Sequence, residues 1–244
     1  MSTLIKDLRS LLPKALRRWL VRQSRLPRIG TVDAGDLRRL KPFSTAWGND
    51  RGTPVDRYYI EAFLAQHAPD IHGRVLEIGD DTYTVRFGGR KVEQSEVLHA
   101  APGNPIATYV ADLTDAPQLP TAAFDCMICT QTIHVINDVQ AAMATIHRVL
   151  KPGGVLLATF PGISRIYRDA DGQWLDYWRF TVNSARSLAE RYFAPVDTQT
   201  RVYGNVLSAT SFLYGLAAEE LLREELDYHD ELYQVTIGVR AVKQ

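Results

Sequence analysis

The chain has 244 residues, 45% of them hydrophobic and 23% charged, and its 28 Lys and Arg residues balance its 28 Asp and Glu residues. This composition allows one large domain with a sizeable core. The sequence contains no run of 18 apolar residues and no signal-peptide pattern, which excludes a membrane-spanning helix and predicts a cytoplasmic protein.

Charge is distributed unevenly along the chain. Residues 1–41 hold 11 Lys and Arg against 3 Asp and Glu, a balance of +8 that the rest of the chain offsets. We therefore expect a basic arm and linker over residues 1–40 and one domain over residues 41–244. Within the arm, residues 3–26 place leucines and Trp19 at helical spacing between basic residues, which predicts an amphipathic helix.

Two interpretations of this helix stay open. In the first, residues 1–28 bind an anionic membrane surface, which would hold the protein at the inner face of the membrane. In the second, the helix packs on the domain or on a partner chain, which would allow an oligomer. Nucleic acid is not an expected partner, because the basic residues do not continue beyond the arm.

The rest of the chain is organised around residues 73–80, GRVLEIGD. Apolar residues followed by Glu77 and Gly79 predict a short buried strand that ends in a turn. In open α/β sheets ligands lie beyond the carboxyl ends of the strands, and a glycine lets the backbone approach them closely. Further strands are predicted at residues 106–113, 123–130, 155–160, 196–202 and 233–242.

Helices are predicted between these strands. Thr53 as N-cap and Pro54 at the first helical position predict a helix that ends near His67. Asp138 is the expected N-cap of a second helix. Further helices are predicted at residues 182–191 and 206–226.

Three motifs resemble the class I S-adenosylmethionine (SAM) dependent methyltransferases of type 11: VLEIG at residues 75–79, FDCMIC at 124–129 and LKPGGVLL at 150–157. Residues 47–61, WGNDRGTPVDRYYIE, are similar to a bacterial subgroup found near glycosyltransferase and polysaccharide genes. The resemblance implies an α/β fold with a Rossmann-like sheet, mostly parallel with an antiparallel last strand. It also implies SAM as cofactor and methyl transfer to a hydroxyl acceptor, a small molecule or a glycan such as a sugar or polysaccharide.

The loop after Gly79 departs from the family pattern. Asp81 and Tyr83 stand where the motif E-x-G-x-G-x-G has its second and third glycines. Residues 83–92 alternate and contain Gly88 and Gly89, which predicts a hairpin in place of the first crossover helix. An alternative function is therefore a non-catalytic binding or scaffold module with a degenerate cofactor loop.

The resemblance carries over to particular cofactor residues. Glu77, Gly79 and Asp80 would form the cofactor turn, and Gln131 would lie near the methionine end. Glu96 would hold the ribose, with Glu93 as competitor for that role. Asp112 and Leu113 would contact the adenine, although Asp112 is also explained as a strand-ending turn residue.

The acceptor residues are less specific. His134 follows a predicted strand end, where its imidazole either takes a proton from an acceptor hydroxyl or bonds loop carbonyls. Candidate acceptor contacts are Arg51, Arg57 and Tyr58 at the start of the first helix, and Trp174 and Tyr177 in the later aromatic cluster; a surface charge network and plain core packing are the respective alternatives.

Cys126 and Cys129 form a C-x-x-C pair. Both lie in the predicted strand 123–130, where a spacing of three puts side chains on opposite faces. We therefore expect core cysteines and no metal site.

Overall fold

The computed structural model describes residues 29–30, 32, 34–168, 173 and 176–244. The chain divides into two compact units, Met1–Lys41 and Pro42–Gln244. In the first unit, a 3₁₀ turn spans Gly35–Leu37, and the predicted amphipathic helix at residues 3–26 lies outside the described residues. The fold described below is that of the second unit.

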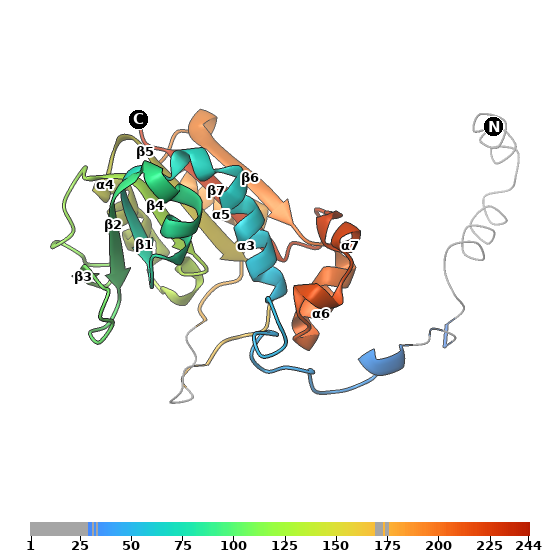
Figure 1. Cartoon of the computed structure of the whole chain (residues 1–244). Coiled ribbons are helices and arrows are strands. Elements are labelled where there is room, and N and C mark those ends of the chain that lie inside the picture. Colours follow the sequence, from blue (N-terminus) through green and yellow to red (C-terminus); the bar gives the residue numbers. More distant parts are fainter. Residues whose placement is uncertain (1–28, 31, 33, 169–172, 174–175) are drawn as a thin grey trace, which may run out of the picture. The chain divides into compact units, whose positions relative to one another are not determined.

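A seven-stranded sheet with strand order β3-β2-β1-β4-β5-β7-β6 forms the centre of the second unit (Figure 1). The strands are β1 (Gly73–Ile78), β2 (Val92–His99), β3 (Tyr109–Val110), β4 (Phe124–Thr130), β5 (Leu150–Pro161), β6 (Thr198–Tyr203) and β7 (Thr236–Val242). Strands β1 to β5 pair in parallel, and β7 runs antiparallel to both β5 and β6. The predicted fold, a mostly parallel sheet with an antiparallel last strand, is confirmed.

Two apolar clusters cover the two faces of this sheet. The helices are α3 (Val55–Gln66), α4 (Val139–Val149), α5 (Val182–Ala189), α6 (Val206–Tyr214) and α7 (Arg223–Asp227). One cluster joins Leu76 and Met127 to α4 and α5, and the other joins Val75 and Ile128 to α3 and α6. Successive strand residues thus point to opposite faces, and both faces are buried, as in parallel sheets generally.

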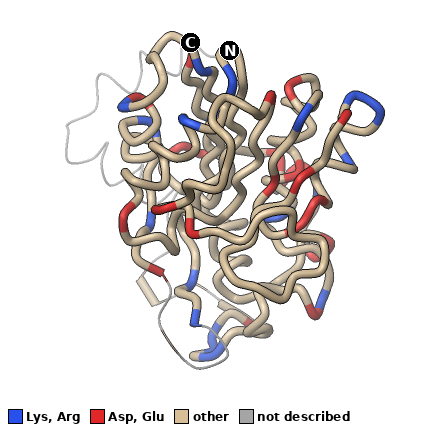
Figure 2. Tube along the Cα trace, turned by 90° about the vertical axis from the view of Figure 1, so that its left-hand side faces the viewer, with Lys and Arg blue, Asp and Glu red and all other residues tan. Residues whose placement is uncertain are grey.

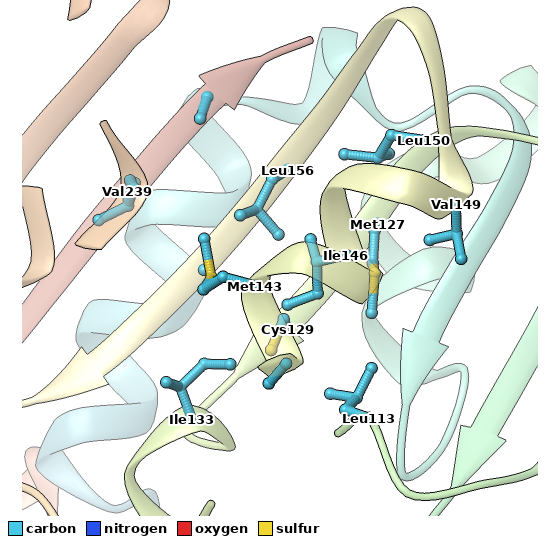
Figure 3. Packing of buried hydrophobic residues seen from close by; sticks show 14 of the residues in the cluster. Leu113, Met127, Cys129, Ile133, Met143, Ile146, Val149, Leu150, Leu156 and Val239 are labelled. Atoms are coloured by element: carbon cyan, nitrogen blue, oxygen red, sulfur yellow. The ribbon is translucent and has the colours of Figure 1, made fainter. Parts of the chain in front are cut away.

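The two cysteines belong to different faces of the sheet, as their spacing predicts. Cys129 packs with Met143 and Ile146 beneath α4 (Figure 3), whereas Cys126 belongs to the cluster beneath α3. Both thiols are free and fully buried. Burial raises the pKa of the Cys129 thiol to about 12, so it stays protonated and unreactive at neutral pH.

The predicted hairpin at residues 83–92 is wrong, because the chain there forms a short helical crossover. A π-helical turn spans Thr84–Gly88, and a 3₁₀ turn at Gly89–Lys91 leads into β2. Tyr83 and Phe87 lie on one face of this turn with their ring centroids 6.1 Å apart. Gly88 is needed for packing, since an added Cβ would come within 2.4 Å of the Val92 side chain.

The structure corrects three further predictions. The third strand is limited to Tyr109–Val110. The N-cap of α3 is Pro54, and Thr53 instead bonds the Glu219 carboxylate. The predicted helix at 206–226 is two helices, because Gly215, with φ +70°, ends α6 in a left-handed cap.

Lys and Arg positions are interspersed with Asp and Glu positions along the trace in the view of Figure 2. Among the described residues, no helix is both long enough and apolar enough to cross a membrane.

Candidate functional site

Three adjoining cavities lie at the carboxyl ends of the parallel strands. Cavity A, about 430 Å³, and cavity C, about 440 Å³, share Ile78 at the end of β1. Cavity B, about 350 Å³, shares Trp47, Asp56 and Gln131 with cavity A. The three cavities therefore form one continuous candidate site of the size that small ligands occupy.

Glu77 positions the turn between cavities A and C. Its side chain is 2% exposed, and its carboxylate accepts hydrogen bonds from the Tyr83 and Thr84 N–H groups and from the Thr84 hydroxyl. Burial raises the pKa of Glu77 to about 7, although these hydrogen bonds oppose the shift. Glu77 does not line the cavities, so its role in the structure is to hold the helical turn against the strand end.

Gly79 places no side chain in the space beside this turn. Its φ is +94°, and an added Cβ would meet no atom within 4 Å. Ile78 and Asp80 on either side both line cavity A. The turn thus keeps the close backbone approach that the glycine predicts, without the two glycines that Asp81 and Tyr83 replace.

Asp112 and Leu113 line cavity C together with Ile78 and Tyr177. Within the described part of the chain, both hydrogen bonds to the Asp112 side chain come from Thr114 and go to Oδ1. The second carboxylate oxygen is therefore left for a ligand donor. Asp112 is both a turn residue and a cavity residue, so the two interpretations of it are compatible.

Glu96 lies away from the cavities. It pairs with Leu76 in the middle of β2, is 4% exposed, and forms an ion pair with Arg74 at 3.0 Å. The residue at the end of β2, where a ribose-binding carboxylate was expected, is His99. We therefore leave Glu96 out of the candidate site, and its competitor Glu93 lies still further from the end of the strand.

Gln131 lies at the junction of cavities A and B in a strained conformation. Its φ is +45°, which is rare for a residue other than glycine. Its N–H donates to the Thr159 carbonyl across the end of β5, while its buried Nε2 has no hydrogen-bond partner among the residues described. Strain together with an unsatisfied buried amide is typical of a ligand-binding position.

Asp56 on α3 faces the same junction. Burial raises the pKa of its carboxyl to about 6, and its Oδ1 accepts a hydrogen bond from the Arg57 N–H. Within the described residues it forms no ion pair. Since Arg57 also lines cavity A, this cavity offers a carboxylate and a guanidinium to one ligand.

His134 and Asp176 form a buried pair in cavity B. His134 Nε2 lies 3.1 Å from Asp176 Oδ1, and their side chains are 13% and 4% exposed. Asp176 also accepts hydrogen bonds from Arg179 at 3.0 and 2.9 Å. The His134 carbonyl accepts hydrogen bonds from the Tyr177 and Trp178 N–H groups, which fixes the two segments against each other.

This pairing determines the state of the imidazole. Burial lowers the pKa of His134 to about 4, and the nearby Asp176 carboxylate only partly offsets the effect. At neutral pH the ring is uncharged, so its Nε2–H donates to Asp176 and Nδ1 keeps a lone pair. Nδ1 is buried and without a hydrogen-bond partner in the described chain.

The other predicted acceptor residues have different surroundings. Arg51 pairs with Glu220, and the Tyr58 hydroxyl donates to Asp227 at 2.7 Å, so both belong to a charge network between α3 and the α6–α7 segment. Tyr177 lies in cavity C and is 57% exposed. Trp174 lies outside the described residues.

Sequence reasoning missed five residues as site candidates: Trp47, Asp56, Arg165, Asp176 and Arg179. Trp47 and Asp56 belong to the 47–61 segment that carries the subgroup resemblance, and Asp176 and Arg179 to the aromatic cluster. Arg165 has no comparable signal, because only the fold brings it over the Trp47 ring.

Comparisons with known proteins bear on this site. Residues 63–158 match the family model described as a methyltransferase domain. The chain is 28% identical over 163 residues to a ubiquinone biosynthesis O-methyltransferase of Mesorhizobium japonicum, covering 53% of this chain and 64% of that protein. It therefore spans less than two thirds of this curated relative.

Two solved structures share the fold. A SAM-dependent methyltransferase from Archaeoglobus fulgidus aligns over 77% of this chain and 94% of its own, with 13% identity and a TM-score of 0.52. The [4+2]-cyclase SpnF aligns over 79% and 84%, with 16% identity and a TM-score of 0.51. The family model and the curated relative thus show a chain similar to methyltransferases over part of its length, and the two solved structures show a shared fold.

The described residues fit SAM, the cofactor that the sequence motifs imply. The bare turn at Gly79 and the carboxylate of Asp112 suit an adenosine group, and the opposite charges of cavity A suit an amino acid group with its own ammonium and carboxylate.

Proposed function

We propose that this protein is a SAM-dependent methyltransferase that acts on a hydroxyl group. The observation that carries the proposal is the bare Gly79 turn between two cavities of complementary chemistry. Cavity C would take the adenosine, with Asp112 accepting from its amino group and Leu113 against the ring. Cavity A would take the methionine end, with Asp56 and Gln131 at its inner side.

SAM supplies a methyl group activated by the sulfonium to which it is attached. The protein's own task is to orient the acceptor and to exclude water. His134 Nδ1 would accept the proton of the acceptor hydroxyl, and Asp176 would stabilise the imidazolium as it forms. Gln131, which lines both cavities, would position the reacting groups at their junction.

Two glycines provide the test of the cofactor turn. Gly79 and Gly153 both have positive φ, +94° and +79°, and an added Cβ at either would meet no atom within 4 Å. Gly79→Ala and Gly153→Ala should therefore lose similar stability, while the Gly79→Ala methyl group fills the space we assign to the cofactor. By calorimetric titration with S-adenosylhomocysteine, Gly79→Ala should bind at least about tenfold more weakly and Gly153→Ala like the unchanged protein.

Equal affinity in both variants would remove Gly79 from the cofactor site. No binding by the unchanged, folded protein would favour a second candidate, a binding or scaffold module without catalysis. The observation behind that candidate is the single helical crossover turn, in which Asp81 and Tyr83 replace two glycines.

The acceptor class is the finer part of the proposal. The proposal that the acceptor is a sugar or polysaccharide hydroxyl rests on the resemblance of residues 47–61. We extend it to a role in polysaccharide biosynthesis, a cytoplasmic location and attachment to the inner face of a membrane through residues 1–28. Cavity B, at about 350 Å³, has room for a small-molecule acceptor or for one unit of a glycan.

A further inference from the structure

Unsatisfied polar atoms concentrate in cavity B. Among the described residues, six buried side-chain N or O atoms have no hydrogen-bond partner, and four of them belong to residues that line this cavity. The four are Gln131 Nε2, His134 Nδ1, Arg165 Nε and Arg179 Nε. Buried polar groups are nearly always bonded in folded proteins, so this concentration indicates a polar ligand.

The four atoms define which ligand groups would satisfy them. The Gln131 amide nitrogen and both arginine Nε–H groups can only donate hydrogen bonds, whereas His134 Nδ1 accepts one. A matching ligand therefore presents several acceptor oxygens and one hydroxyl. Guanidinium donors favour oxygens that carry negative charge.

Of the two arginines that line the cavity, only Arg179 forms an ion pair among the described residues. Asp176 is shared by His134 and Arg179, both of which lie within 3.1 Å of it. Arg165 stacks over Trp47 with its Cζ 3.6 Å from the ring centroid and donates to the Thr45 carbonyl, but it forms no ion pair within the described residues. Burial lowers the pKa of the Arg165 guanidinium, which nevertheless stays charged.

Asp56 is not an ion-pair partner of Arg165 in the described structure. It lines cavities A and B, yet in the described structure it is not within ion-pair distance of either arginine. Arg165 is partly buried, and the carboxylate that acts on it electrostatically, Asp176, is already bonded to His134 and Arg179. This makes Arg165 a site for an anion that comes from outside the chain.

We propose that cavity B binds a hydroxylated organic anion, with the carboxylate or phosphate of the acceptor at Arg165 and its hydroxyl at His134 Nδ1. Arg179 Nε and Gln131 Nε2 donate to further oxygens of the same molecule. The identity of the anion as a methyl acceptor rests on the proposed function, whereas its binding does not. The volume of about 350 Å³ limits the bound part to roughly one sugar or one aromatic ring.

The test compares the affinities of anionic sugars and inorganic phosphate with the affinity of a neutral sugar. Glucuronate, glucose 6-phosphate, glucose and inorganic phosphate are titrated calorimetrically, at constant ionic strength, into the protein with S-adenosylhomocysteine present and absent. We expect at least one of the three anions to bind about tenfold or more tightly than glucose. Comparing the affinity for glucuronate with that for glucose 6-phosphate decides whether the site at Arg165 prefers a carboxylate or a phosphate.

Variants with matched charge changes test whether the anion binds at Arg165. Arg165→Gln should weaken anion binding about tenfold or more, and Arg165→Lys, which keeps the charge, should weaken it less. Arg90→Gln, at an exposed arginine on the crossover turn, makes the same charge change and should have no effect. An unchanged urea-unfolding transition shows that each variant is folded.

The proposal is overturned if no anion, inorganic phosphate included, binds the unchanged protein more tightly than it binds Arg165→Gln. It is also overturned if glucose binds as tightly as every anion. Failure of S-adenosylhomocysteine to bind is a separate result, which contradicts the proposed function while the comparison of anions with glucose still decides this inference.

Discussion

Glu77 illustrates how one residue can match a motif and yet act through its neighbours. The motif places a carboxylate two residues before the glycine, where a direct contact with the cofactor is one expectation. The structure has this carboxylate buried and bonded to the start of the crossover turn. It is a positioning residue, which is why its removal would disturb the turn before it disturbed any ligand.

The raised pKa of Glu77 predicts a pH dependence of stability. Its pKa is about 7 in the folded protein against the usual 4.5, so the folded state holds this proton more tightly. The contribution of Glu77 is therefore complete below about pH 4.5 and is lost as the pH rises to 7, by roughly 3 kcal/mol. The free energy of unfolding in urea, measured at pH 5, 6.5 and 8, should fall with pH relative to Glu77→Gln. A difference between the two proteins that is constant with pH would contradict the shift.

The state of His134 can be tested without knowing the acceptor. We expect its imidazole to titrate near pH 4 as the Nε2–H tautomer, because burial disfavours the charge and Asp176 accepts that hydrogen. Asp176→Asn should lower the pKa further by removing the carboxylate charge. Nitrogen-15 NMR of the ring reports both quantities. A proton on Nδ1 would exclude the proposed proton acceptor, whereas a pKa near the ordinary value would contradict the effect of burial.

At the scale of elements, the α6–α7 segment between β6 and β7 explains three sequence expectations at once. Arg51 and Tyr58, expected as acceptor contacts, and Thr53, expected as a helix cap, instead bond Glu220, Asp227 and Glu219 of this segment. The segment thereby anchors the start of α3, the helix that carries Asp56 into the cavities. Exposed pairs of this kind add little stability each, so their effect is to position α3.

Gly215, which ends α6, should be far less tolerant than Gly153. Both have positive φ, but an added Cβ at Gly215 would lie 2.3 Å from the Ser44 carbonyl oxygen, while at Gly153 it would meet nothing within 4 Å. Gly153→Ala should lose about 1–2 kcal/mol from the left-handed backbone alone. Gly215→Ala should lose clearly more, as measured by urea unfolding; equal losses would show that α6 shifts freely away from Ser44.

For the whole molecule, the sheet and its cavities belong to Pro42–Gln244, while the predicted amphipathic helix belongs to the arm. If the arm binds membranes, deleting residues 1–28 should abolish sedimentation with anionic vesicles, because the basic and apolar faces are lost together. The domain should keep its affinity for S-adenosylhomocysteine. Sedimentation that persists after the deletion would assign membrane binding to the domain instead.

Local patterns in the sequence were enough to predict strands β1, β4, β5, β6 and β7. Short apolar runs, the glycine at the end of β1 and the turn before β5 predict the strands because each depends on residues close together in the chain. The hairpin prediction failed because a buried carboxylate, Glu77, bonds the N–H groups that start a helical turn. Alternation of side chains could not reveal that bond.

By itself, then, the sequence determined the α/β fold, the turn at Gly79 and the carboxylate Asp112 after the third strand. Only the tertiary structure decided that Glu96 pairs with Arg74, that Asp176 meets His134 across 42 positions, and that Arg165 stacks on Trp47. The physical reason is that strand ends are local signals, whereas the partners of a buried charge depend on which loops the folded sheet brings together.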